Sequence, residues 1–81
     1  MAAPAAPLDS LRREHRFGRW LVARGMARLA DAEAFGVEAP RSLLLSWQAR
    51  GFVEPTDPQG LAWQALAPFE EVARSGGFTL L

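Results

Sequence analysis

Hydrophobic positions in the first third of the chain recur with the period of a helix. Phe17, Trp20 and Leu21 stand at i, i+3 and i+4, so a helix places them in one apolar stripe. Asp and Ser at positions 9–10 are suited to cap the start of such a helix, and Gly25 is suited to end it. The pattern therefore predicts a first helix from about residue 9 to residue 24, either kinked at Gly18 or starting later, near Arg16, because a glycine within a helix is unfavourable.

A shorter apolar pattern follows directly. Met26, Leu29 and Ala30 have helical spacing, and Phe35 closes the segment. Gly36 can adopt the left-handed conformation that ends a helix, which other residues adopt only at a cost. We therefore expect a second helix over residues 26–35, with Met26, Leu29 and Ala30 facing the core.

Pro40 is suited to the first turn of a third helix, because its missing N–H group would be unpaired there in any case. The apolar positions Leu43, Leu44 and Trp47 form the expected inner face, and Gly51 ends the helix after Arg50. Leu45 falls off this stripe. It is therefore expected at the surface or against the first helix.

The period changes after Gly51. Phe52 and Val53 favour strand, the next seven residues are rich in turn formers, and residues 61–66 alternate loosely between apolar and polar. This predicts a β-hairpin anchored by Trp63. One or two helical turns are expected from Phe69 to residue 74, with Phe69 facing inward.

Two stretches, residues 29–37 and 43–53, are similar to bacterial and phage winged helix-turn-helix domains, as a generic resemblance to no specific family. The matching features are the Gly36-Val37 turn and the step Arg50-Gly51-Phe52-Val53 from a helix into a strand. The resemblance implies a mainly helical fold with a small β-hairpin, a three-helix winged helix-turn-helix with a short C-terminal helix. Residues 9–75 would form this domain, with the wing at residues 52–67. Residues 1–8 would be a flexible Ala/Pro-rich leader, and residues 76–81 a tail.

Similar domains bind double-stranded DNA by placing the third helix in the major groove and the wing over the backbone. The leading hypothesis is accordingly a small DNA-binding protein, a regulator or an accessory factor of a mobile element. Charge along the chain permits this: residues 1–30 carry six arginines against two acids, although the formal net charge of the chain is zero. The alternative for these arginines is simple solvation on exposed helix faces. The expected DNA contacts are Arg12, Arg13, Arg16, Arg19, Arg41, Gln48 and Arg50.

The competing hypothesis is a module that binds protein, as an adaptor or as an accessory domain of a nucleic-acid machine. The wing contains Glu54 and Asp57 and no basic residue, which disfavours contact with phosphates. Exposed apolar residues would bind the partner or a second copy of the chain, unless the C-terminal ones fold back over the core. The candidates are Leu45, Phe78, Leu80 and Leu81.

Composition narrows the classes of function that remain possible. The chain has 81 residues, enough for one domain, with no Cys and a single His, so a protein-only zinc site is not expected. His15 lies in a polar run and is expected at the surface. Asp31 with Glu33, and Glu70 with Glu71, have spacings that place each pair on different sides of a helix rather than as a catalytic pair.

No nucleotide-binding or nucleophile motif occurs, so we expect no enzyme activity, no cofactor and no small-molecule substrate. No apolar run is long enough to span a membrane, and no signal peptide is indicated, so no membrane partner is expected and a cytoplasmic location is the default.

Overall fold

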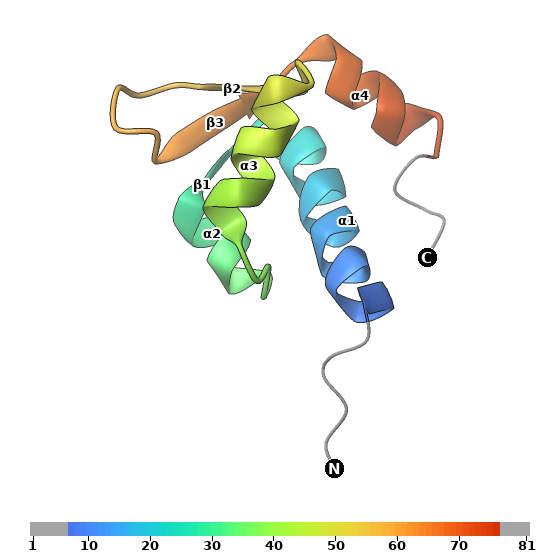
Figure 1. The fold of residues 1–81 in the computed structure, drawn as a ribbon. Coiled ribbons are helices and arrows are strands. Elements are labelled where there is room, and N and C mark those ends of the chain that lie inside the picture. The colour runs from blue at the N-terminus through green and yellow to red at the C-terminus, as the bar shows by residue number, and fades with distance from the viewer. Residues whose placement is uncertain (1–6, 77–81) are drawn as a thin grey trace.

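The computed structural model describes residues 7–76 and contains four helices and three short strands in this range (Figure 1). In chain order they are α1 (Pro7–Arg24), β1 (Met26–Arg28), α2 (Leu29–Ala34), α3 (Pro40–Ala49), β2 (Val53–Pro55), β3 (Ala62–Ala65) and α4 (Ala67–Arg74). The predicted class, mainly helical with a small β-hairpin, is confirmed. The hairpin is, however, part of a three-stranded sheet.

Helix α1 begins two residues earlier than its sequence pattern predicts and runs unbroken through Gly18. Phe17 and Leu21 are completely buried, as their spacing predicts. Gly25 ends the helix with φ of 88°, and its N–H donates to the carbonyl of Leu21 at 2.7 Å. This is the left-handed stop that glycine adopts without steric cost.

The prediction of one helix over residues 26–35 is wrong. Residues 26–28 form β1, and only Leu29–Ala34 is helical. In a strand, alternate side chains point to opposite faces, so Ala27 is buried while Met26 is 50% exposed. Ala30 is also exposed, and Ala32 takes the buried position of α2. The backbone N–H of Arg28 donates to the Asp31 carboxylate at 2.8 Å, which caps the helix start.

Helices α2 and α3 both end in the same glycine-centred turn. At Gly36 (φ 81°), the N–H groups of Gly36 and Val37 donate to the carbonyls of Glu33 and Ala32 at 2.9 and 3.2 Å. After α3, at Gly51 (φ 78°), the N–H groups of Gly51 and Phe52 likewise donate to the carbonyls of Gln48 and Trp47, at 3.0 and 2.9 Å. These two hydrogen bonds define a Schellman motif, which satisfies the last carbonyls of a helix.

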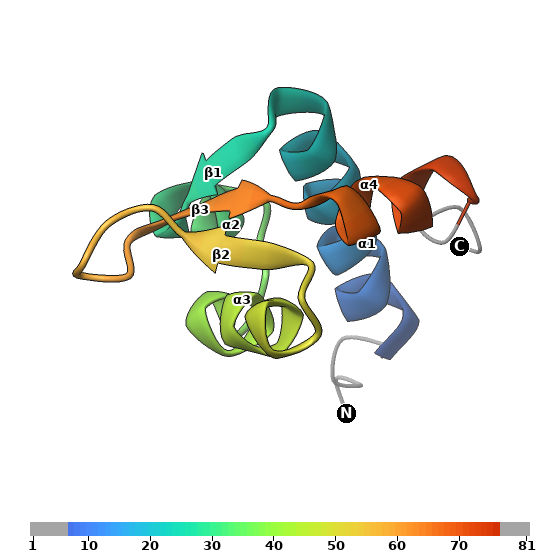
Figure 2. The same ribbon diagram turned by 90° about the horizontal axis from the view of Figure 1, so that it is seen from above.

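The three strands are antiparallel in the order β1-β3-β2, so β1 pairs with the second strand of the hairpin (Figure 2). Ala27 pairs with Trp63, and Val53 pairs with Ala65. One Asp57 carboxylate oxygen accepts hydrogen bonds from the N–H groups of Leu61 and Ala62, at 2.9 and 3.0 Å, and holds the hairpin loop closed.

The core lies between the helices and the sheet. Its largest fully buried side chains come from α1, α3, α4, β2 and β3 and are Trp63, Phe17, Phe69, Leu21, Leu44 and Val53. Trp63 is therefore the anchor of the hairpin, as predicted. Stacked and tilted rings connect the elements: Trp47 lies 5.9 Å from Phe17 and 4.8 Å from Phe69, between ring centroids. The helical turns predicted over residues 69–74 belong to α4. Phe69 packs this helix against the core.

Candidate functional site

The solvent face of α3 is an uncharged strip. Ser42, Leu45, Ser46 and Ala49 stand at i, i+3, i+4 and i+7, so they lie on one side of the helix, and all four are exposed. Leu44 and Trp47 are buried on the opposite side. We call these four residues the outward strip of α3. The prediction that Leu45 lies at the surface is confirmed by its 48% exposure.

Two polar candidates flank this strip on the side of the hairpin. The Arg41 guanidinium lies beside the hairpin loop, with Nη1 3.5 Å from the position that a Cβ on Gly60 would take. Gln48 is exposed, and its Oε1 accepts a hydrogen bond from the indole N–H of Trp63 at 3.3 Å. The Gln48 side chain is thus held by the hairpin, and the Arg41 side chain lies beside the hairpin loop.

Arg50 lies on the other flank. It lines a hollow of about 340 Å³ between α1 and α3, together with His15 and Trp47. Arg41 and Arg50 therefore bracket the outward strip from opposite sides and from opposite ends of the helix.

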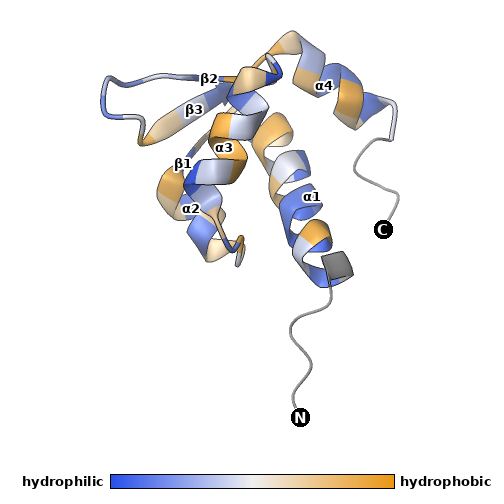
Figure 3. Cartoon of the chain, viewed as in Figure 1, coloured by the Kyte–Doolittle hydropathy of each residue, from blue (hydrophilic) through white to orange (hydrophobic). Residues whose placement is uncertain are grey.

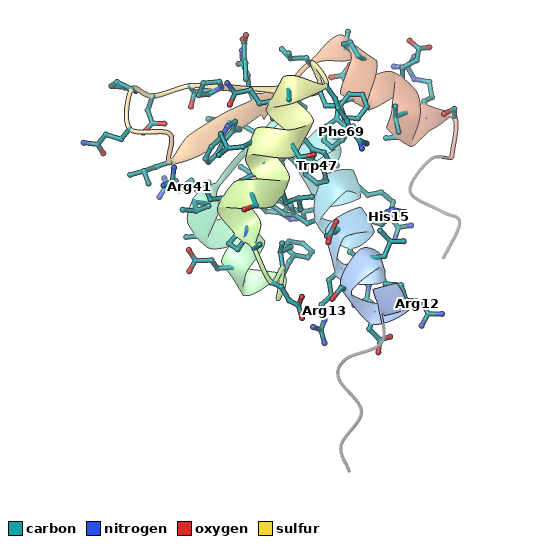
Figure 4. The ribbon with its side chains drawn as sticks, viewed as in Figure 1. Arg12, Arg13, His15, Arg41, Trp47 and Phe69 are labelled. Atoms are coloured by element: carbon teal, nitrogen blue, oxygen red, sulfur yellow. The ribbon has the colours of Figure 1, made fainter. Side chains whose placement is uncertain are left out.

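The arginines of α1 do not join them. Arg12, Arg16 and Arg19 stand at i, i+4 and i+7, are exposed, and lie on the side of α1 opposite Phe17 and Leu21. Figure 4 shows Arg12 and Arg41 projecting in opposite directions. Arg12 also lies 3.8 Å from the Asp9 carboxylate. The polar face of α1 extends along much of the helix (Figure 3).

Arg13 occupies a third position. Its Cδ lies 3.4 Å from where a Cβ on Gly36 would be, so its side chain covers the turn between α2 and α3. The seven side chains predicted to contact DNA are therefore distributed over the outer face of α1, the α2–α3 turn and the two flanks of α3.

The hairpin adds no cation to this surface. Glu54 and Asp57 are its charged residues, and Glu54 accepts a hydrogen bond from the Gln64 side chain across the strands. Asp57 is engaged by the loop backbone. The acids of the hairpin thus have structural partners, and the hairpin as a whole is electronegative.

Sequence patterns missed several exposed apolar side chains. Met26 and Leu61 are 50% and 43% exposed, and Leu11 is 42% exposed. Leu61 lines a second hollow, of about 270 Å³, with Leu29 and Ala30. The alternation of β1 was the only signal for Met26, and three residues are too few to display it. Three predicted partner-binding residues, Phe78, Leu80 and Leu81, lie outside the described residues.

The described part of the chain holds no group of three or more His, Cys, Asp or Glu side chains placed to bind a metal ion. His15 is partly buried at the side of the hollow beside Arg50 rather than freely exposed. Among residues 7–76, no helix combines the length and the hydropathy that a membrane span requires.

Comparison with protein-family models, with curated proteins and with solved structures finds no match for this chain.

Proposed function

We propose that this chain is a winged helix-turn-helix module that binds a protein partner through the outward strip of α3. The order helix, strand, two helices and hairpin supports that arrangement, as does the pairing of β1 with the hairpin. The two Schellman turns fall at Gly36-Val37 and Gly51-Phe52, where the sequence resembles winged domains.

The uncharged outward strip is the observation that carries the proposal. Bases are read by Arg, Lys, Asn or Gln side chains on the face of the recognition helix that enters the major groove. The middle of the exposed face of α3 instead presents two serines, an alanine and Leu45. The small side chains around Leu45 allow a partner to approach this exposed leucine closely.

The surrounding charge favours the same conclusion. Affinity for DNA depends on the neutralisation of several phosphates. Residues 52–67 contain no Lys or Arg, and the α1 stripe of Arg12, Arg16 and Arg19 lies on the far side of that helix from the core on which α3 packs. A duplex that contacted α3 would meet an electronegative hairpin.

The flanking arginines indicate the chemistry of the partner. Arg41 and Arg50 lie nine residues apart, which is about 13.5 Å along a helix. A partner with an apolar contact for Leu45 and carboxylates on either side of it would complement this surface. The partner is thus expected to be an acidic protein segment.

Capture with three forms of the full chain tests the proposal. Wild type and Leu61→Asp should retain the same cross-linked partner from a lysate, whereas Leu45→Asp should lose it. Leu61 is the matched control because it is an apolar side chain of similar exposure on the hairpin. With the purified partner, Leu45→Asp should weaken binding about tenfold or more, the effect of losing a central contact worth about 1.4 kcal/mol. Equal binding by both variants would contradict the proposal.

Direct DNA binding, as a regulator or accessory factor of a mobile element, is the second candidate. It is favoured by the exposure of Arg41 and Gln48 on α3 and of Arg50 directly after it. Arg13, Arg41 and Arg50 could neutralise about three phosphates, giving a slope of about −2.7 for log K against log salt. Titration of duplex DNA between about 50 and 200 mM salt measures this slope. Binding with that slope, lost in Arg41→Ala, would replace the protein-binding proposal.

A further inference from the structure

An apolar groove lies between α1, α3 and α4. It consists of two adjoining hollows of about 340 and 540 Å³, which share Phe52 and Val72 among their lining residues. The rest of the apolar wall is formed by Leu11, Leu43, Trp47, Ala67 and Pro68. The 540 Å³ hollow is a shallow depression open to solvent, and the 340 Å³ hollow is more enclosed.

Aromatic rings continue beneath the groove. Phe52 and Phe69 are stacked with their centroids 5.2 Å apart, and Phe69 in turn lies 4.8 Å from Trp47 (Figure 4). A further aromatic ring placed in the groove would extend this cluster, since rings favour offset or edge-on contact with other rings.

The groove carries charges of both signs. Glu14 and Glu71 contribute acids, and Arg50 contributes a cation. A strongly acidic or strongly basic ligand would therefore meet a like charge somewhere along the groove. An uncharged apolar segment fits better.

The chain supplies such a segment at the end of the groove. Ser75 lines the 540 Å³ hollow, and Gly76 has φ of 85°, a conformation that turns the chain after α4. Residues 77–81 read Gly-Phe-Thr-Leu-Leu, with no charge and three large apolar side chains. Five residues reach at most about 17 Å. In an extended segment Phe78 and Leu80 face the same side.

We propose that Phe78 and Leu80 dock into the groove between α1, α3 and α4 of their own molecule. A tether this short gives an effective concentration in about the millimolar range, so docking within one molecule is favoured over docking into a second copy. The groove would then be covered, together with Ser46 and Arg50 in its wall, and Ser42, Leu45 and Ala49 would remain as the exposed part of the outward strip. This inference does not depend on the proposed function.

Nuclear Overhauser effects in the full chain test the docking directly. We expect contacts between the ring protons of Phe78 and the methyl groups of Leu43 and Val72, with intensities that do not change on dilution. A sample that mixes labelled and unlabelled chains should show none of these contacts between different molecules. Their absence in the wild type would overturn the proposal, and so would their appearance only between copies, which would make a second chain the occupant.

Two substitutions provide the matched comparison. Phe78→Ala should shift the methyl resonances of Leu43 and Val72 and should abolish the ring contacts of residue 78. Thr79→Ala, on the opposite side of an extended segment, should leave these signals in place. Unchanged methyl resonances in Phe78→Ala, or equal shifts in both variants, would contradict docking of Phe78. The wild-type measurement remains decisive if a variant fails to fold.

Discussion

The indole N–H of Trp63 donates a hydrogen bond to Oε1 of Gln48 at 3.3 Å and thereby connects β3 to the exposed edge of α3. Trp63 is almost completely buried, whereas Gln48 is exposed. One residue of the hairpin therefore contributes to the core and also positions a side chain on the candidate binding helix.

This hydrogen bond is expected to contribute modestly to stability. Gln48→Ala should lower the free energy of unfolding by about 1 kcal/mol, because it leaves the indole N–H without its partner. Urea denaturation of Gln48→Ala, Trp63→Phe and the double variant forms a double-mutant cycle, with an expected coupling of about 0.5–1.5 kcal/mol. Gln59→Ala, in the exposed hairpin loop, is the control. Strictly additive effects would show that the two side chains do not interact in solution.

Neighbouring residues of strand β1 should differ in their tolerance of substitution, because one is exposed and the next is buried. Met26→Lys should change stability by less than about 0.5 kcal/mol, because Met26 is half exposed. Ala27→Leu should cost about 1–3 kcal/mol, because Ala27 is 3% exposed and a larger side chain overfills the core. Chemical denaturation of both variants measures the difference. A larger loss of stability in Met26→Lys than in Ala27→Leu would instead support the helix that the sequence pattern predicts over residues 26–35.

The error at β1 has a physical cause. Met26, Leu29 and Ala30 happen to have helical spacing, and three residues cannot display the alternation of a strand. The strand exists because Ala27 pairs with Trp63, 36 positions later, and no local pattern contains that information. The longer elements α1 and α3 were predictable, because their stripes and terminal glycines are encoded within each segment.

The sequence predicted the exposure of single residues of the candidate surface but not how these residues are arranged relative to one another. Spacing alone indicated that Leu45 lies off the buried stripe of α3, and the structure agrees. It could not indicate that Arg12 and Arg41 project in opposite directions, because that depends on how α1 packs against α3 (Figure 4). The summed charge of residues 1–30 therefore suggested one basic face, whereas in the folded chain these arginines lie on different sides of the molecule.

The two glycines that end α1 and α2 provide a test of local strain against local contact. Gly25→Ala should cost about 1–2 kcal/mol from its positive φ alone, because no atom lies within 4 Å of the added Cβ. Gly36→Ala should cost a similar amount, because the added Cβ would lie 3.4 Å from Cδ of Arg13, which is an ordinary contact with a flexible side chain. Thermal and urea unfolding of each variant measure these costs. Adding Arg13→Ala to Gly36→Ala should leave the cost unchanged, and a recovery of stability would instead assign part of the cost to contact with the Arg13 side chain.

Charge reversal on two helices distinguishes the surface of α3 from that of α1. Arg41→Glu and Arg50→Glu should each weaken binding of an acidic protein partner about fivefold, because each replaces an attraction of up to about 1 kcal/mol by a repulsion. Arg16→Glu and Arg19→Glu are matched controls that alter the same net charge on the outer face of α1 and should leave the affinity unchanged. Isothermal titration at low and raised ionic strength measures the effect, which salt should reduce. Equal losses in all four variants would show that net charge, rather than the flanks of α3, governs binding.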